Sequence, residues 1–128
     1  GADVLDVNMG VPLTDEPELM RQAITLVQSI TDLPLCLDSS VVEALQVGLE
    51  TYQGKALVNS TTAEDERLAV ILPLIKKHGA AIIALTNDES GLPMVPEERL
   101  AMTDKIVGWK VSGFHLPDII ANRETCNI

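Results

Sequence analysis

The chain has 128 residues, of which 46% are hydrophobic, and it carries a formal net charge of −10. This length suits one domain or part of one, and the apolar content is too high for a disordered chain. The negative charge argues against a nucleic-acid partner, because binding phosphate groups requires a basic surface.

Strand-like and helix-like segments alternate along the sequence. Short apolar runs predict strands at 3–8, 33–38, 55–60, 80–88 and 117–122. Apolar residues at helical spacing predict helices at 15–30, 40–52, 61–79 and 96–110. Strands that alternate with helices every 20 to 30 residues or so are typical of parallel βα units.

The predicted helix ends carry recognisable capping residues. Ser40 is followed three residues later by Glu43, which is the spacing of a capping box. Thr61 or Thr62 is expected to cap the next helix, and Gly79 to end it. These helices should therefore begin directly after the strands that precede them.

Two architectures are compatible with parallel βα units, an open doubly wound sheet and a closed (β/α)₈ barrel. No glycine-rich phosphate-binding loop follows any predicted strand, which weakens the case for a nucleotide-binding sheet. We therefore favour an α/β fold that forms part of a (β/α)₈ TIM-type barrel, with about four to five parallel βα units.

Polar residues stand at the carboxyl ends of the predicted strands. In chain order they are Asp6, Asn8, Asp38, Asn59, Asn87, Asp88 and Asn122. In a parallel barrel these strand ends meet on one rim, where active sites are built. The alternative for each residue is that it merely caps a helix or forms a turn.

A rim of carboxylates and amides without Lys, Arg or His suits a neutral ligand that is rich in N–H donors and ring-nitrogen acceptors. A pterin ring fits, because its 2-amino group and neighbouring N3–H form a double donor edge that a carboxylate can accept. Magnesium or calcium is the chemical alternative, but half of these positions are amides. We expect no metal site.

The remaining features suggest where the protein resides. The longest apolar run, 80–85, is far shorter than the roughly 20 residues that span a bilayer. The sequence opens with no basic and apolar leader. Cys36 and Cys126 are too few for a disulfide framework. These observations predict a cytoplasmic protein without membrane contacts.

Four segments together resemble the pterin-binding family. They are GADVLDVNMG at 1–10, LPLCLDSS at 33–40, GKALVNSTTAEDER at 54–67 and KKHGAAIIALTNDESGLP at 76–93. The likeness runs from Gly1 to about Lys105 and is strongest to methyltetrahydrofolate:corrinoid protein methyltransferases and the folate domain of cobalamin-dependent methionine synthase. Dihydropteroate synthase is more distantly similar.

This resemblance implies a barrel that binds methyltetrahydrofolate at its C-terminal mouth and passes the N5-methyl group to a cobalt(I) corrinoid. Asp38 and Asn59 would be pterin ligands, with Asp6 and Asn8 lining the same pocket. The sequence contains no D-x-H-x-x-G cobalamin-ligand motif, so the corrinoid would arrive on a partner protein or domain. No catalytic residue is assigned.

The sequence departs from the family pattern near its end. The family's fifth strand usually ends in Asp-Pro, where this chain has Asn122 and Arg123. An Asn can accept from only one of two neighbouring pterin donors, which predicts a cost of about 1–3 kcal/mol in affinity. The whole segment 108–128 is atypical.

A (β/α)₈ barrel typically needs about 250 residues. We therefore expect residues 1–128 to be a fragment of a pterin-binding barrel domain, a truncated reading frame, or a half-barrel that pairs as a homodimer. A non-catalytic α/β binding or interaction module is the functional alternative.

Overall fold

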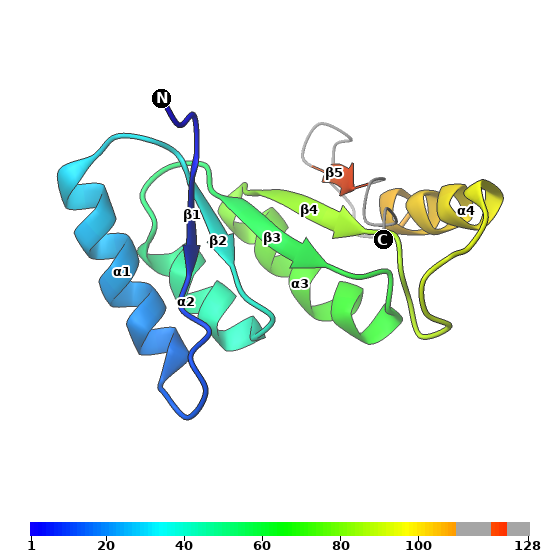
Figure 1. Cartoon of the computed structure of the whole chain (residues 1–128), viewed down its shortest axis with the longest axis horizontal. Helices are drawn as coiled ribbons and strands as arrows, with labels where there is room; N and C mark the ends of the chain where they lie inside the picture. Colours follow the sequence, from blue (N-terminus) through cyan, green and yellow to red (C-terminus); the bar gives the residue numbers. More distant parts are fainter. Residues whose placement is uncertain (110–118, 123–128) are drawn as a thin grey trace.

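The computed structural model describes residues 1–109 and the strand at 119–122. Strands and helices alternate along the described chain (Figure 1). In chain order these are β1 (Leu5–Asn8), α1 (Glu16–Ile30), β2 (Leu35–Asp38), α2 (Val42–Thr51), β3 (Leu57–Thr61), α3 (Asp65–His78), β4 (Ala81–Leu85), α4 (Pro96–Val107) and β5 (Ile119–Asn122). Every predicted element is found, and most are shorter than expected.

The strands form one parallel sheet whose spatial order, β1-β2-β3-β4-β5, is the order of the chain. A doubly wound sheet reverses direction at a switch point, so its strand order cannot be sequential. A sequential order with a helix after each strand is that of a (β/α)₈ barrel. The structure thus confirms part of a TIM-type barrel and excludes the doubly wound alternative.

The helices α1, α2 and α3 lie together on one side of the sheet (Figure 1). Alternate strand residues on that side, including Val7, Leu37, Val58 and Ile82, are buried in the main core. The residues between them, such as Asp6 and Asn8, are more exposed. The sheet therefore has one covered face and one open face, and the open face corresponds to the interior of a barrel.

Helix α3 matches its sequence pattern closely. The expected apolar face, Leu68, Ile71, Leu72 and Ile75, is buried. The helix ends at Gly79, whose φ of 60° lies in the left-handed region that glycine tolerates best. This helix packs against β3 and places its N-terminal end at the carboxyl ends of the strands.

Helices α1 and α2 cross closely at Gly48. A Cβ atom at this position would lie 3.2 Å from Leu37 Cδ1, 3.2 Å from Met20 Cγ and 3.3 Å from Ile24 Cδ1. The missing side chain lets α2 approach both β2 and α1. The packing of these two helices therefore depends on a glycine in a helix interior, where glycine is otherwise unfavourable.

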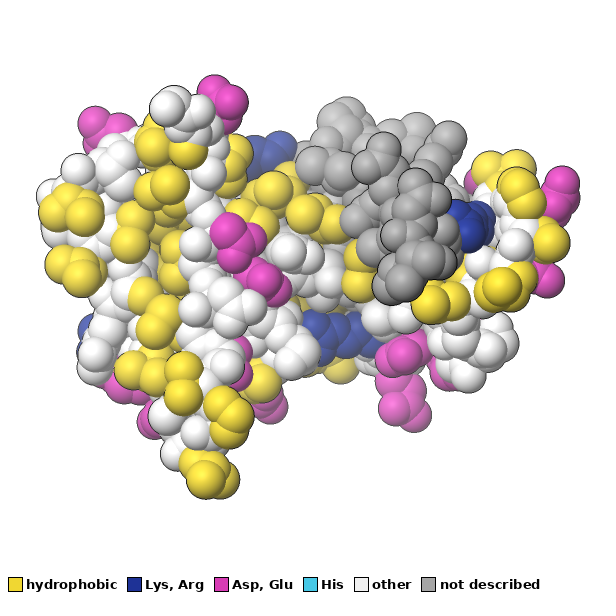
Figure 2. Space-filling view, in the orientation of Figure 1, with side chains coloured by type: hydrophobic (Ala, Val, Ile, Leu, Met, Phe, Trp, Pro, Cys, Tyr) yellow, Lys and Arg dark blue, Asp and Glu magenta, His cyan; other side chains and the backbone are white. Residues whose placement is uncertain are grey.

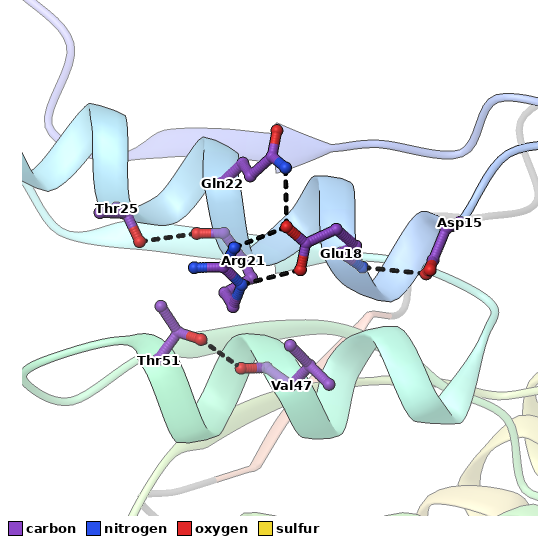
Figure 3. A network of polar contacts seen from close by, with 7 residues as sticks. All are labelled: Asp15, Glu18, Arg21, Gln22, Thr25, Val47 and Thr51. Atoms are coloured by element: carbon purple, nitrogen blue, oxygen red, sulfur yellow. Dashed lines mark hydrogen bonds and ion pairs between the residues drawn. The ribbon is translucent and has the colours of Figure 1, made fainter.

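The first turns of α1 are held by a polar network (Figure 3). The Asp15 carboxylate accepts a hydrogen bond from the Glu18 backbone N–H at 3.2 Å and caps the helix. The Glu18 carboxylate accepts from Arg21 at 2.8 and 2.5 Å and from Gln22 at 2.7 Å. Hydrogen bonding by Arg21, followed by that of Gln22, lowers the pKa of Glu18 to about 2.

This network predicts a pH dependence of stability. The folded-state pKa of Glu18 lies below its ordinary value of 4.5, so its contribution is present above pH 4.5 and is lost as the pH falls toward 2. Thermal melts between pH 2 and 7 should find Glu18→Gln less stable than the parent at pH 7, with the difference shrinking toward pH 2. Arg21→Gln should behave in the same way. A pH-independent difference would contradict the prediction.

Within residues 1–109 and 119–122, no helix has the length and apolar character needed to cross a membrane.

Candidate functional site

Three of the predicted site residues lie side by side at the carboxyl end of the sheet. Asn8 of β1 is the register partner of Asp38 in β2, and Asp38 is the register partner of Asn59 in β3. Neighbouring strands are about 4.8 Å apart, and paired residues share a face. One carboxylate flanked by two amides therefore forms a row on the open face of the sheet, which we call the Asn-Asp-Asn row.

The Asn8 side chain orients the carboxylate. Its Nδ2 donates to Asp38 Oδ2 at 2.9 Å, and its Oδ1 accepts from the Gly10 backbone N–H at 2.9 Å. Both ends of the amide are thus engaged within the protein. This geometry fixes the plane of the Asp38 carboxylate and leaves it acceptor lone pairs for a ligand.

Asp6 lies one step below the row, as the register partner of Cys36. Burial raises the pKa of the Cys36 thiol to about 12, with further contributions from a hydrogen bond with Asp6 and from the charges of Asp6 and Asp38. Cys36 is 5% exposed. The thiol is therefore neutral near pH 7 and fills the sheet surface beneath the row.

The raised pKa predicts an unreactive thiol. At pH 8, alkylation of Cys36 by iodoacetamide should be about 1,000-fold slower than in the urea-unfolded chain, because the thiolate is the nucleophile and raising the pKa from 9.0 to about 12 lowers its fraction by that factor. Asp6→Asn should lower the thiol pKa and speed the reaction. Peptide mass spectrometry separates Cys36 from Cys126. A rate in the folded chain within a few-fold of the unfolded rate would contradict the assignment.

A pocket of about 350 Å³ opens beside the row, at the carboxyl ends of β2, β3 and β4. It is lined by Asp38, Ser39, Ser40, Ser60, Thr62, Glu64, Arg67 and Leu85. Figure 2 shows acidic side chains over the strands at the centre of this face and basic side chains to their lower right. The pocket lies at the end of the sheet where a TIM-type barrel builds its active site.

Arg67 changes the expected chemistry of this rim. We predicted a rim without Lys, Arg or His, but the guanidinium of Arg67 lines the pocket. It donates to the Ser40 carbonyl at 2.8 Å and to the Ser60 carbonyl at 3.3 Å. Burial lowers the pKa of Arg67, and the charge of Glu64 opposes that shift. Sequence reasoning missed this residue because it lies in a helix rather than at a strand end.

The predicted helix caps were wrong at both loops that border the pocket. Helix α2 begins after Val41 rather than Ser40, and helix α3 begins after Glu64 rather than Thr61 or Thr62. Neither N-cap residue makes a side-chain capping hydrogen bond, although the Asp65 N–H in the first turn of α3 donates to the Glu89 carboxylate at 3.0 Å. Strand β3 extends through Thr61, with an irregular register from Asn59 to Thr61. The loops are longer than expected, and their hydroxyl groups line the pocket.

Ser39 supplies the polar contacts expected of Ser40. Its hydroxyl accepts from the Val41 backbone N–H at 2.9 Å and donates to the Glu16 carboxylate at the start of α1. Ser39 is only 5% exposed. The residue directly after Asp38 is thereby fixed to two helices.

Two other predicted strand-end residues, Asn87 and Asp88, lie beyond the end of their strand. Strand β4 ends at Leu85, so Asn87 and Asp88 belong to the loop that follows rather than to the strand. The Asn87 carbonyl accepts from the Ala63 N–H at 2.7 Å, and the Asp88 carboxylate accepts from the Ser90 N–H at 2.8 Å. Both hydrogen bonds hold loops together, which is the turn role considered as the alternative.

Asn122 ends β5 at the register position of Leu85 in β4. Its side chain, together with 110–118 and 123–128, lies outside the described residues, and so does most of the atypical segment 108–128. Within the described part of the chain, no group of three or more His, Cys, Asp or Glu residues could hold a metal ion.

Comparison with known proteins identifies the family. Residues 1–112 match the pterin binding enzyme family. The chain is 30% identical over 112 residues to methionine synthase from Mycobacterium tuberculosis and, equally, to methionine synthase from Mycobacterium leprae. Each match covers 84% of this chain but only 9% of the relative. The fold, the row of polar strand ends and this match over most of the sequence agree, and the chain belongs to the pterin-binding enzyme family.

Proposed function

We propose that this chain provides the pterin-binding part of a methyltransferase that takes the N5-methyl group of methyltetrahydrofolate. The Asn-Asp-Asn row beside a pocket at the carboxyl ends of the strands carries the proposal. Family membership and the similarity to methionine synthases support it. The chain spans about a tenth of those relatives, so the complete reaction is part of the proposal.

The row fits the hydrogen-bonding edge of a pterin. The Asp38 carboxylate would accept a charge-assisted hydrogen bond from an N–H group of the ring, and such a bond is stronger than one between neutral groups. Asn59 can both donate and accept, as the other ring atoms require. Asn8 already holds Asp38 at 2.9 Å, which makes it an orienting residue rather than a direct ligand.

The methyl acceptor would be a cobalt(I) corrinoid carried by a partner protein or domain, which supplies the nucleophile when it is bound. The methyl group would leave N5 as that nitrogen gains a proton or a strong hydrogen bond. This chain's contribution would be to hold the pterin so that the methyl carbon faces the acceptor. We assign the proton donor to none of the described residues.

Calorimetric titration with methyltetrahydrofolate tests the proposal. Binding in the micromolar range that is strongly weakened in Asn59→Ala would support it. Conversion of added cob(I)alamin to methylcobalamin, followed by absorbance, tests the transfer step separately. The absence of binding at millimolar ligand would refute the pterin site and leave the non-catalytic α/β module as the remaining interpretation.

Asn122 offers a test by gain of affinity. Asn122 stands where the family usually has an Asp that grips the pterin's donor edge, and β5 is paired to β4 at this position. Asn122→Asp should tighten methyltetrahydrofolate binding by about tenfold, because a carboxylate accepts from both donors. Asn87→Asp, in the loop after β4, is the matched control and should leave affinity unchanged. Equal or weaker binding by Asn122→Asp would contradict the prediction.

A further inference from the structure

Arg67 joins the ends of two neighbouring strands. It extends from the first turn of α3 and is half-buried beside the pocket. Its Nη1 donates to the carbonyl of Ser40, two residues after Asp38, at 2.8 Å. Its Nη2 donates to the carbonyl of Ser60, directly after Asn59, at 3.3 Å. One side chain therefore spans the segments that follow the two proposed pterin ligands.

The segments that follow Asp38 and Asn59 are held mainly by different elements. Regular pairing of β2 with β3 ends at Asp38 and Asn59, and the Ser39 N–H donates to the Asn59 carbonyl at 3.1 Å. Beyond these residues, β3 continues to pair with β4 through a register shift between Asn59 and Thr61. Ser39, after β2, is held instead by Val41 and by Glu16 of α1. The two segments are thus anchored to different neighbours, and the hydrogen bonds of Arg67 connect them to each other.

A guanidinium group suits this role better than an ammonium group. Its donors are fixed in a planar fork, so one side chain can satisfy two carbonyls at a set separation. A lysine would reach only one of them with comparable geometry. The half-buried position strengthens both hydrogen bonds relative to those of an exposed side chain.

We propose that Arg67 is a positioning residue that fixes the spacing between Asp38 and Asn59 and thereby preorganises the pterin-binding row. This inference deepens the proposed function and rests on it only for the identity of the ligand. The protection of the strand ends against hydrogen exchange can be measured without any ligand. Arg67 touches backbone carbonyls rather than a proposed ligand, so its effect on binding is indirect.

Amide hydrogen exchange on the whole chain tests the positioning role directly. In Arg67→Gln, exchange within 38–41 and 59–62 should be about tenfold faster, while exchange in the core of α1 stays unchanged. Arg21→Gln is the matched control, because the exposed Arg21 side chain donates to the Glu18 carboxylate of the same helix (Figure 3). If exchange is unchanged in both segments, or rises equally throughout the chain, the inference is overturned.

Methyltetrahydrofolate titration provides the second measurement. Arg67→Gln should weaken binding by about tenfold at a temperature where circular dichroism shows the variant to be folded. The affinity of Arg67→Lys should lie between those of the parent and Arg67→Gln. Arg67→Lys replaces Arg67→Gln in the test if the glutamine variant does not fold. Equal affinity in folded Arg67 variants and parent overturns the inference while the proposed function stands. If the parent itself does not bind, the proposed function fails and hydrogen exchange alone decides the role of Arg67.

Discussion

Asp38→Ala should weaken methyltetrahydrofolate binding by about 100-fold or more. The carboxylate would accept a charge-assisted hydrogen bond from the pterin, which contributes about 1.5–3 kcal/mol. The substitution also removes the acceptor for Asn8 Nδ2, so the neighbouring amide loses its orientation. Calorimetric titration at a fixed pH near 7 measures the change in dissociation constant.

Two control variants separate the role of the Asp38 carboxylate as a ligand from the effects of losing side-chain volume or a negative charge. Asp38→Asn keeps the shape of the side chain and one acceptor oxygen, so its affinity should lie between that of the parent and that of Asp38→Ala. Asp32→Ala removes an exposed acidic residue near the opposite end of the same strand and should leave affinity unchanged. Binding of Asp38→Ala within twofold of the parent would exclude Asp38 as a ligand.

Gly48→Val should lower the free energy of unfolding by about 2 kcal/mol, which is typical of overpacking a core. A Cβ alone would already lie 3.2 Å from Leu37 Cδ1 and from Met20 Cγ. The two methyl groups of valine must therefore push α1 and α2 apart. Urea denaturation should give a lower midpoint with an unchanged slope.

Gln46→Val provides the matched control for this prediction. Residue 46 is exposed on the same helix, so the substitution carries the helix-propensity cost of a β-branched residue without any crowding. Its expected loss is about 0.5 kcal/mol. If Gly48→Val is no more destabilising than Gln46→Val, the close approach of α1 and α2 does not limit packing at this position.

The two groups of predictions test different levels of the structure. The Gly48 substitution concerns packing on the covered face of the sheet, and the Asp38 substitution concerns chemistry at the carboxyl ends of the strands. A chain that fails the second test but passes the first would have the family's fold without its ligand. That outcome is the non-catalytic module considered from the sequence.

The sequence by itself determined the class of fold and the composition of the polar row. Apolar runs and helical periodicity depend on neighbours within a few residues, so β1 to β5 and the buried face of α3 could be read directly. Parallel strands bring their carboxyl ends to one edge, so Asn8, Asp38 and Asn59 could be grouped without coordinates. The hydrogen-bonding chemistry of these residues suggested a pterin, and the family resemblance then implied methyltetrahydrofolate as the expected ligand.

Only the tertiary structure decided the strand order, the helix starts and the place of Arg67. Capping patterns at Ser40 and Thr61 were locally reasonable, but the paired sheet extends β3 through Thr61 and delays α3, and Ser39 rather than Ser40 makes the hydroxyl contact before α2. Arg67 reaches Ser40 across 27 positions of sequence, and no local pattern encodes such a contact. The physical reason is that these features depend on contacts between segments that are far apart in the sequence, and such contacts form only when the chain folds.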